Sequence, residues 1–202
     1  MNIRYDFSDT QIPECFSWFN PPAVYKSGNG LEMTTKARTD FWQRTHYGFR
    51  RDDGHCLLTE INDDFCLTTC VVFKPKEKYD QCGLMVRLDE NNWIKMGTEY
   101  ENAEISRLGS VVTNLGYSDW ATRDVPTTAE QQIFYRIHKN GPDFLLENSQ
   151  DGRTFAQMRI AHLHAPFTKL SIGVYACSPI GENFWCRFSW LEISENQWAY
   201  KE

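Results

Sequence analysis

The chain has 202 residues, of which 41% are hydrophobic and 24% are charged, which is the composition of an ordinary globular protein. A net charge of −6 would repel a phosphate backbone, so we expect no nucleic-acid partner. No apolar run approaches the roughly 18 residues of a membrane-spanning helix, and the first residues lack the apolar core of a signal peptide. We therefore expect a cytoplasmic protein with no membrane partner.

Seven cysteines are scattered along the chain, and their spacing fits neither a disulfide nor a zinc site. On a strand, Cys66 and Cys70 would lie about 13 Å apart, too far for a disulfide bond. His162 and His164 are a single pair of candidate ligands, which is too few for a metal site. We expect free thiols in a reducing cytosol, no metal and no cofactor.

Short alternating runs of apolar and polar residues, bounded by turn residues, predict β-strands along nearly the whole chain. Asn-Gly and Asp-Gly turns supply the positive φ angles that hairpins need. The weak helical candidate is 127–134. So many short strands in one domain, residues 1–202, require two stacked antiparallel sheets. The predicted strands are 30–37, 41–49, 55–61, 64–74, 79–88, 92–101, 104–114, 131–139, 143–149, 154–161, 168–178 and 183–195.

Residues 40–49, DFWQRTHYGF, are dense in aromatic and polar side chains. Read as a strand, they place Trp42, Arg44 and His46 on one face and Tyr47 on the core face, unless a bulge at Gly48 reverses it. Trp42 would stack on a ligand and His46 would hydrogen-bond it. In the alternative interpretation, Trp42 covers the sandwich edge and His46 satisfies a loop carbonyl.

The hairpin 79–100 predicts a sheet with two different faces. A three-residue loop pairs Arg87 with Trp93 and sends Ile94 and Met96 to the core, whereas an even loop would expose them. Burying those two side chains favours the odd loop by about 1.5–3 kcal/mol each. The opposite face is either a binding surface or a plain solvated sheet, and it carries Gln81, Arg87, Trp93, Lys95 and Glu99.

Two further groups of polar residues have alternative interpretations. Asp119 and Trp120 belong to NLGYSDW, which we expect to be a loop at the sandwich rim that forms a second part of the site. Alternatively, Trp120 plugs one end of the core. Asp80 either caps a turn or reaches a ligand.

Several segments together resemble a known family: TDFWQRTHYGF (39–49), YDQCGLMVRLDENNWIKMGTEY (79–100), VVTNLGYSDW (111–120) and SQDGRTF (149–155). They resemble an uncharacterised family that includes the regulation-of-enolase protein, within the concanavalin A-like lectin/glucanase superfamily. The resemblance implies an all-β jelly-roll sandwich of two stacked antiparallel sheets, one concave and one convex. It implies no established reaction.

The glucanases of that superfamily carry Glu-x-Asp-x-x-Glu on one strand, and no Glu-x-Asp occurs here. The nearest echo is Glu99 with Glu101, which we expect to be solvated in a turn. Whether the protein is an enzyme therefore stays open.

Three functions remain as hypotheses. The first is a cytosolic protein that binds a carbohydrate or sugar-like ligand on its concave face. The second is a glycoside-acting enzyme with Glu99 as acid or base, assisted by His46 or Lys95. The third is a regulatory protein-interaction module related to enolase regulation, which should present a flat apolar patch instead of a cleft.

Overall fold

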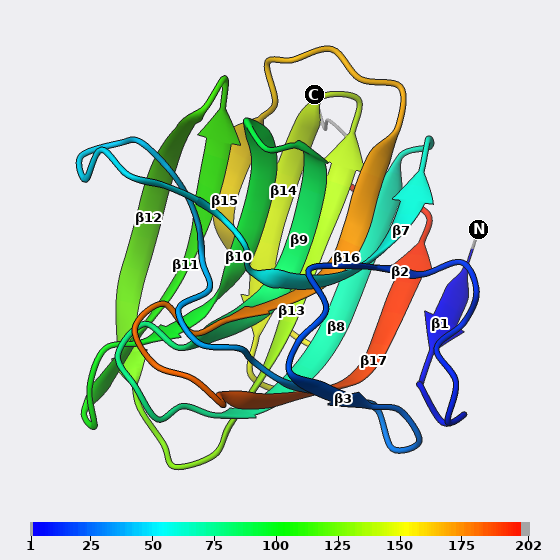
Figure 1. Cartoon of the computed structure of the whole chain (residues 1–202). Coiled ribbons are helices and arrows are strands. Elements are labelled where there is room, and N and C mark those ends of the chain that lie inside the picture. The colour runs from blue at the N-terminus through cyan, green and yellow to red at the C-terminus, as the bar shows by residue number, and fades with distance from the viewer. Residues whose placement is uncertain (1, 199–202) are drawn as a thin grey trace.

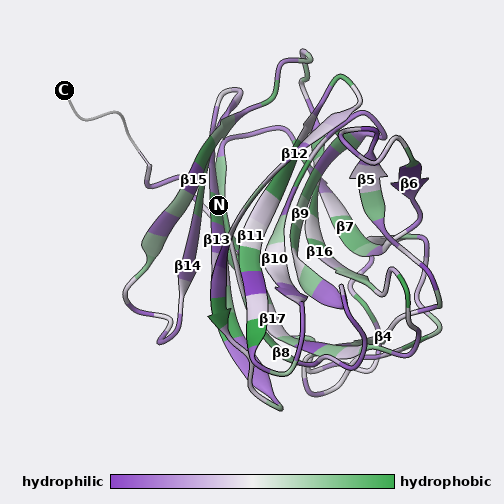
Figure 2. Ribbon diagram, turned by 90° about the vertical axis from the view of Figure 1, so that its left-hand side faces the viewer, coloured by the Kyte–Doolittle hydropathy of each residue, from purple (hydrophilic) through white to green (hydrophobic). Residues whose placement is uncertain are grey.

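The computed structural model describes residues 2–198, and within them all regular structure is β, with 17 strands and no helix that could cross a membrane. Two large antiparallel sheets stack face to face, as the alternating pattern predicted (Figure 1). A small third sheet lies outside one of them, and Figure 2 shows this layering from the side.

The strands of each sheet come from distant parts of the chain. The eight-stranded sheet has the order β15 (Ala156–His162), β14 (Asp143–Ser149), β13 (Gln131–Asn140), β8 (Phe65–Lys74), β17 (Trp185–Ser194), β4 (Leu31–Thr34) and β3 (Val24–Lys26), with β1 (Ile3–Tyr5) pairing β17. The seven-stranded sheet has the order β12 (Tyr117–Pro126), β11 (Ile105–Asn114), β10 (Asn92–Tyr100), β9 (Gln81–Asp89), β16 (Leu170–Cys177), β7 (His55–Ile61) and β2 (Ser17–Phe19). The two-stranded sheet consists of β5 (Phe41–Gln43) and β6 (Arg50–Asp52).

The predicted register of the central hairpin is confirmed. Trp93 lies opposite Arg87, and a bulge between Asn92 and Trp93 supplies the odd residue. Ile94 and Met96 are consequently fully buried in the main core between the two sheets. The other face of β9 and β10 points away from that core.

Five strands, β1, β2, β3, β6 and β12, lie outside the predicted ranges. Strands β1, β2 and β3 are only three residues long, so they carry too little alternation to be recognised. The segment expected to be a rim loop around Asp119 and Trp120 is instead the long edge strand β12, joined to β11 by the two-residue turn Leu115-Gly116. The weak helical candidate is wrong, because β13 begins at Gln131.

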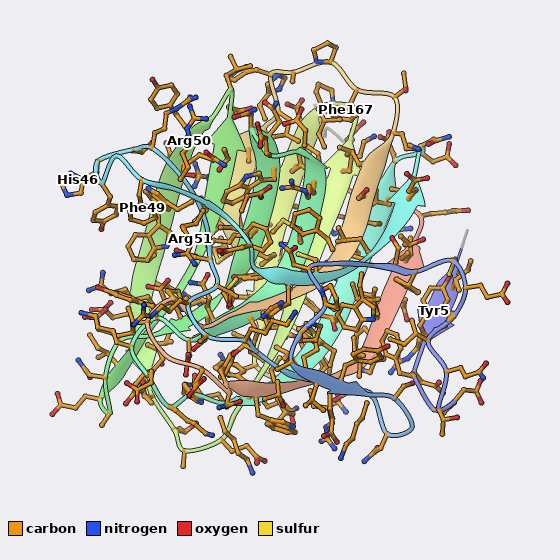
Figure 3. All side chains as sticks on the ribbon, in the orientation of Figure 1. Tyr5, His46, Phe49, Arg50, Arg51 and Phe167 are labelled. Atoms are coloured by element: carbon orange, nitrogen blue, oxygen red, sulfur yellow. The ribbon has the colours of Figure 1, made fainter. Side chains whose placement is uncertain are left out.

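The prediction of one strand over 41–49 is also wrong. Strands β5 and β6 form a hairpin, and its turn puts Arg44, His46 and Gly48 in the left-handed region at φ of 54°, 62° and 77°. Alternation therefore stops at Gln43. Tyr47 is not in the core but 57% exposed. In Figure 3, His46 lies at the outer tip of this turn and points away from the sheet.

A second, smaller core lies on the outer face of the seven-stranded sheet, under the segment that carries β5 and β6. It consists of Phe41, Trp42, Cys56, Leu58, Met85, Trp93, Val111, Tyr175 and Cys177. Figure 1 shows this segment, blue to light blue, crossing in front of the seven-stranded sheet. A solvated sheet face, one of our two alternatives, is therefore wrong for the part around Trp93.

Two predicted ligand-binding residues are structural here. Trp93 is 0% exposed, with its ring 5.9 Å from that of Phe41. Arg87 donates two hydrogen bonds of 2.8 Å to the carboxylate of Asp52, and its guanidinium lies 4.4 Å from the ring of Phe19. Both side chains hold the covering segment against the sheet.

Trp93→Ala should lower the free energy of unfolding by about 3–5 kcal/mol, because it opens a cavity at the centre of the second core. Urea denaturation measures this loss. Val24→Ala, at a 51% exposed apolar side chain, is the control and should change stability by less than about 0.5 kcal/mol. Equal effects of the two substitutions would contradict a packed second core.

Candidate ligand-binding site

A cavity of about 470 Å³ lies between the outer face of the seven-stranded sheet and the covering segment. We call it the floor cavity. Its aromatic lining consists of Trp42, Tyr47, Phe49, Tyr79, Trp120 and Tyr175. Its charged and amide lining consists of Asp40, Arg51, Gln81, Lys95, Glu99 and Arg107. Aromatic rings and hydrogen-bonding groups thus line one space, which is partly open to solvent.

A row of three glycines leaves part of the sheet surface beneath this cavity without side chains. Gly83, Gly97 and Gly109 are direct neighbours on β9, β10 and β11. A Cβ on Gly97 would lie 2.7 Å from the hydroxyl of Tyr175 and 2.3 Å from the carbonyl oxygen of Cys82. The row therefore lets Tyr175 lie across the sheet and leaves open space between the side chains of Lys95 and Glu99.

Glu99 is the central polar group of the floor cavity. Its register neighbours are Gln81 on β9 and Arg107 on β11. The side-chain amide of Gln81 donates to the Glu99 carboxylate at 2.9 Å, and the Tyr175 hydroxyl donates to the Gln81 carbonyl oxygen at 3.4 Å. This chain of hydrogen bonds fixes the carboxyl group on the cavity wall.

Burial raises the pKa of Glu99 to about 7, although the positive charges of Lys95 and Arg107 oppose the shift. The negative charge of Asp40 adds to it. The side chain keeps some surface towards the cavity, while the surrounding rings hold the carboxyl group away from bulk water. Near neutral pH it can therefore either donate or accept a proton.

Lys95 ties the covering segment to the cavity floor. Its ammonium group donates to the carbonyl oxygen of Phe41 at 2.9 Å and lies 3.4 Å from the carboxylate of Asp40. The side chain is almost completely buried. A buried cation without such partners would be strongly unfavourable, so this contact constrains where residues 40 and 41 lie.

A second depression, of about 790 Å³, adjoins the first, and we call it the outer groove. Trp42, Tyr47 and Trp120 line both spaces. His46 and Asp119 line the outer groove but not the floor cavity. The structure therefore does not place the predicted pair of Glu99 and His46 in one cavity. The carboxylate of Asp119 forms a 2.8 Å ion pair with Arg159.

The predicted site residues therefore fall into three groups. Trp42, Gln81, Lys95, Glu99 and Trp120 meet in the floor cavity. His46 and Asp119 lie in the outer groove. Arg44, Arg87 and Trp93 line neither space. Arg44 is also structural: it donates to the Gly116 carbonyl oxygen at 3.1 Å, and its guanidinium lies 5.2 Å from the ring of Tyr117.

Two neighbouring carboxylates also have structural roles. Asp80 caps a turn, because it accepts hydrogen bonds of 2.9 Å from the backbone nitrogens of Lys76 and Glu77. Glu101 is not solvated as expected: its side chain is 13% exposed and pairs with Lys78 at 2.6 Å. It also lies 3.3 Å from Arg107.

Several lining residues were missed by sequence reasoning. Arg107 could have been found, since its strand pairs directly with the strand of Glu99. Tyr79 could also have been found, since alternation in the predicted strand 79–88 gives it the same face as Gln81. Tyr175 carries no such local signal, because only the position of β16 beside β9 brings it to this face. Within residues 2–198, no group of three or more His, Cys, Asp or Glu side chains is arranged to hold a metal ion.

The two stacked antiparallel sheets, with the strand order given above, form an all-β sandwich of the concanavalin A-like class, and the floor cavity lies on the outer face of one of them. The chain belongs to the family described as Protein of unknown function (DUF1349), whose model matches residues 18–196. It is 34% identical over 164 residues to Regulation of enolase protein 1 of Saccharomyces cerevisiae, covering 81% of both chains.

Solved structures share the fold. A functionally unknown protein from Saccharomyces cerevisiae superposes with a TM-score of 0.76 at 30% identity, covering 90% of this chain and 94% of that one. The Bacteroides ovatus protein named Xyloglucan PUL GH43B superposes with a TM-score of 0.75 at 18% identity. That match covers 94% of this chain but 38% of the Bacteroides chain, and it shows the fold alone.

Glu99→Gln should change how stability depends on pH. The pKa of Glu99 is about 7 in the folded protein, compared with the ordinary glutamate pKa of 4.5. Because the folded state binds this proton more tightly than the unfolded state, the wild-type free energy of unfolding falls as the pH rises from 4.5 to about 7. The variant lacks this fall and should be more stable by about 1–3 kcal/mol above pH 7, with the difference vanishing below pH 4.5.

Urea unfolding at several pH values measures the difference. The matched control is Glu104→Gln, at an exposed carboxylate near the start of β11, which should follow the wild-type profile. Parallel profiles for wild type and Glu99→Gln would show that Glu99 titrates normally.

Proposed function

We propose that the protein binds a carbohydrate or a sugar-like molecule in the floor cavity. The observation that carries the proposal is the pairing of aromatic walls with a polar floor: Trp42, Tyr47 and Trp120 face the same space as Gln81 and Glu99. A sugar ring has apolar C–H faces and a rim of hydroxyl groups, so it needs both kinds of surface. The cavity volume of about 470 Å³ is in the usual range for small-molecule sites.

The charges of the floor cavity favour a neutral ligand. Three cationic side chains line it, and each has a carboxylate partner: Arg51 pairs with Asp53 at 2.8 Å, Lys95 with Asp40 and Arg107 with Glu101. A phosphate group would have to compete with these carboxylates. A hydroxyl group can instead accept a hydrogen bond from one of the three cations and donate one to Asp40, which also lines the cavity.

The fold supports the same ligand class without establishing it. The name of the Bacteroides ovatus structure includes xyloglucan, a polysaccharide, although its identity to this chain is only 18%. The name of the yeast relative refers to enolase regulation and to no ligand. The cavity chemistry therefore carries more weight than either name.

The structure supports a regulatory protein-interaction module less well than it supports a ligand-binding protein. Three of the exposed large apolar side chains, Tyr47, Phe49 and Ile180, line the floor cavity. Their position at the cavity fits ligand contact better than a flat docking patch. We also propose a cytoplasmic location, because all seven cysteines are free thiols and six are buried, which suits a reducing compartment.

A glycoside-acting enzyme is the second candidate, and the specific observation for it is a pair of carboxyl groups. Glu99, with its pKa raised to about 7, shares the floor cavity with Asp40, which is paired with Lys95. In hydrolysis, Glu99 would give its proton to the leaving oxygen while Asp40 accepts a proton from the attacking water. His46, the assistant we expected from the sequence, lies outside this cavity.

Sugar binding should appear as thermal stabilisation by members of a panel of monosaccharides, oligosaccharides and sugar phosphates. A ligand at 100 times its Kd adds about 2.7 kcal/mol of stability. Tyr47→Ala should weaken binding at least tenfold, because Tyr47 is an exposed cavity wall whose loss leaves the core intact. Tyr25→Ala, at a similarly exposed tyrosine on β3 away from both spaces, is the control. No stabilisation by any sugar would overturn the proposal.

Hydrolysis of p-nitrophenyl glycosides tests the second candidate. Wild-type activity should fall as the pH rises above about 7, where Glu99 loses its proton. Glu99→Gln and Asp40→Asn should each lower kcat at least 100-fold without preventing sugar binding. A wild type that binds sugars but turns over no glycoside would leave the binding function and exclude this one.

A further inference from the structure

We infer that the outer groove is a second binding subsite continuous with the floor cavity, so that the ligand is an oligosaccharide of two or more units that crosses the edge strand β12. This inference rests on the proposed function and adds the length and direction of the ligand. Beyond the wall that the two spaces share, it adds residues that do not line the floor cavity, among them Tyr117 and His164.

The two spaces share an aromatic wall. Trp42, Tyr47 and Trp120 line both, and the rings of Trp42 and Tyr47 meet edge to face with centroids 5.5 Å apart. The indole nitrogen of Trp42 donates to the carbonyl oxygen of Thr45 at 3.0 Å, which fixes this ring relative to the turn. A chain of sugar rings leaving the floor cavity would keep aromatic contact as it passes this wall.

The strand order gives the direction in which the bound ligand would run. The floor cavity extends from Tyr175 on β16 to Trp120 on β12, which are separated by four strand spacings, or about 19 Å. Beyond Trp120 the outer groove is lined from β15, the edge strand of the other sheet. The combined path runs across the strands and over the side of the sandwich, and it is longer than one sugar ring.

The outer groove offers a second set of groups suited to hydroxyls. It is lined by Tyr117, which is 59% exposed, and by the imidazoles of His46, His162 and His164. The carboxylates nearby already have partners, since Asp119 pairs with Arg159 and Asp143 pairs with His162 at 2.6 Å. Like the floor cavity, this groove therefore favours a neutral polyhydroxy unit.

Contacts with Arg44 fix the position of the Tyr117 ring. The guanidinium of Arg44 lies 5.2 Å from its ring and is itself bonded to the carbonyl oxygen of Gly116. A Cβ on Gly116 would lie 2.6 Å from that guanidinium, so the glycine makes room for it. The hairpin turn of β5 and β6 and the turn between β11 and β12 thus position one exposed ring between them.

Calorimetric titration with β-linked xylose, glucose and galactose series, each from one to four units, tests the inference. Affinity should rise at least tenfold from the monosaccharide to the trisaccharide of the preferred series. Tyr117→Ala should remove this gain, so that the trisaccharide binds no more tightly than the monosaccharide, and His164→Ala should reduce it. Leu115→Ala is the matched control, because Leu115 is 64% exposed in the same turn and lines neither space.

The outcomes separate the two proposals. Monosaccharide and trisaccharide binding with equal affinity would overturn the second subsite and leave the proposed function intact. A length dependence that survives both Tyr117→Ala and His164→Ala would also overturn the subsite. Failure of every sugar to bind would overturn the proposed function and this inference with it.

Discussion

The register of the central hairpin is the constraint on which the rest of the structure depends. Because Trp93 lies opposite Arg87, the small and branched apolar residues of β9 and β10 all point into the main core. The same pairing places Gln81, Lys95 and Glu99 on the outer face, and it aligns Gly83 with Gly97. A shift of one residue would exchange the two faces, bury a lysine and a glutamate among apolar side chains, and remove the floor of the cavity.

The outer face becomes a cavity because polar contacts hold a second layer above it. Lys95 bonds the backbone at Phe41 and pairs with Asp40, while Arg87 pairs with Asp52 on the other strand of the covering hairpin. Phe41 then packs on Trp93 beneath. The charged residues predicted to contact a ligand therefore have two different roles. Lys95 and Arg87 hold the covering segment in place, whereas Glu99 faces the cavity beneath it.

How far the sequence predicted the site depends on the kind of element involved. For the hairpin 79–100, strict alternation and a burial argument were sufficient, and three of its predicted residues, Gln81, Lys95 and Glu99, do meet in the floor cavity. The argument failed for 40–49, where alternation continues through a turn whose positive φ angles break the two-residue period. It failed for 117–126 because a polar edge strand lacks the apolar alternation that marks a strand.

The sequence by itself determined the all-β class, the stacking of two sheets, the family and the two faces of the central hairpin, because alternation and turn chemistry are local properties. Only the tertiary structure decided which side chains share a space. Tyr175 lines the same cavity as Glu99 only because β16 lies beside β9, and the turn between β5 and β6 places His46 in the outer groove instead. Contacts between residues 50 or more positions apart depend on which strands pair, and pairing is set by the burial of the whole core rather than by any local pattern.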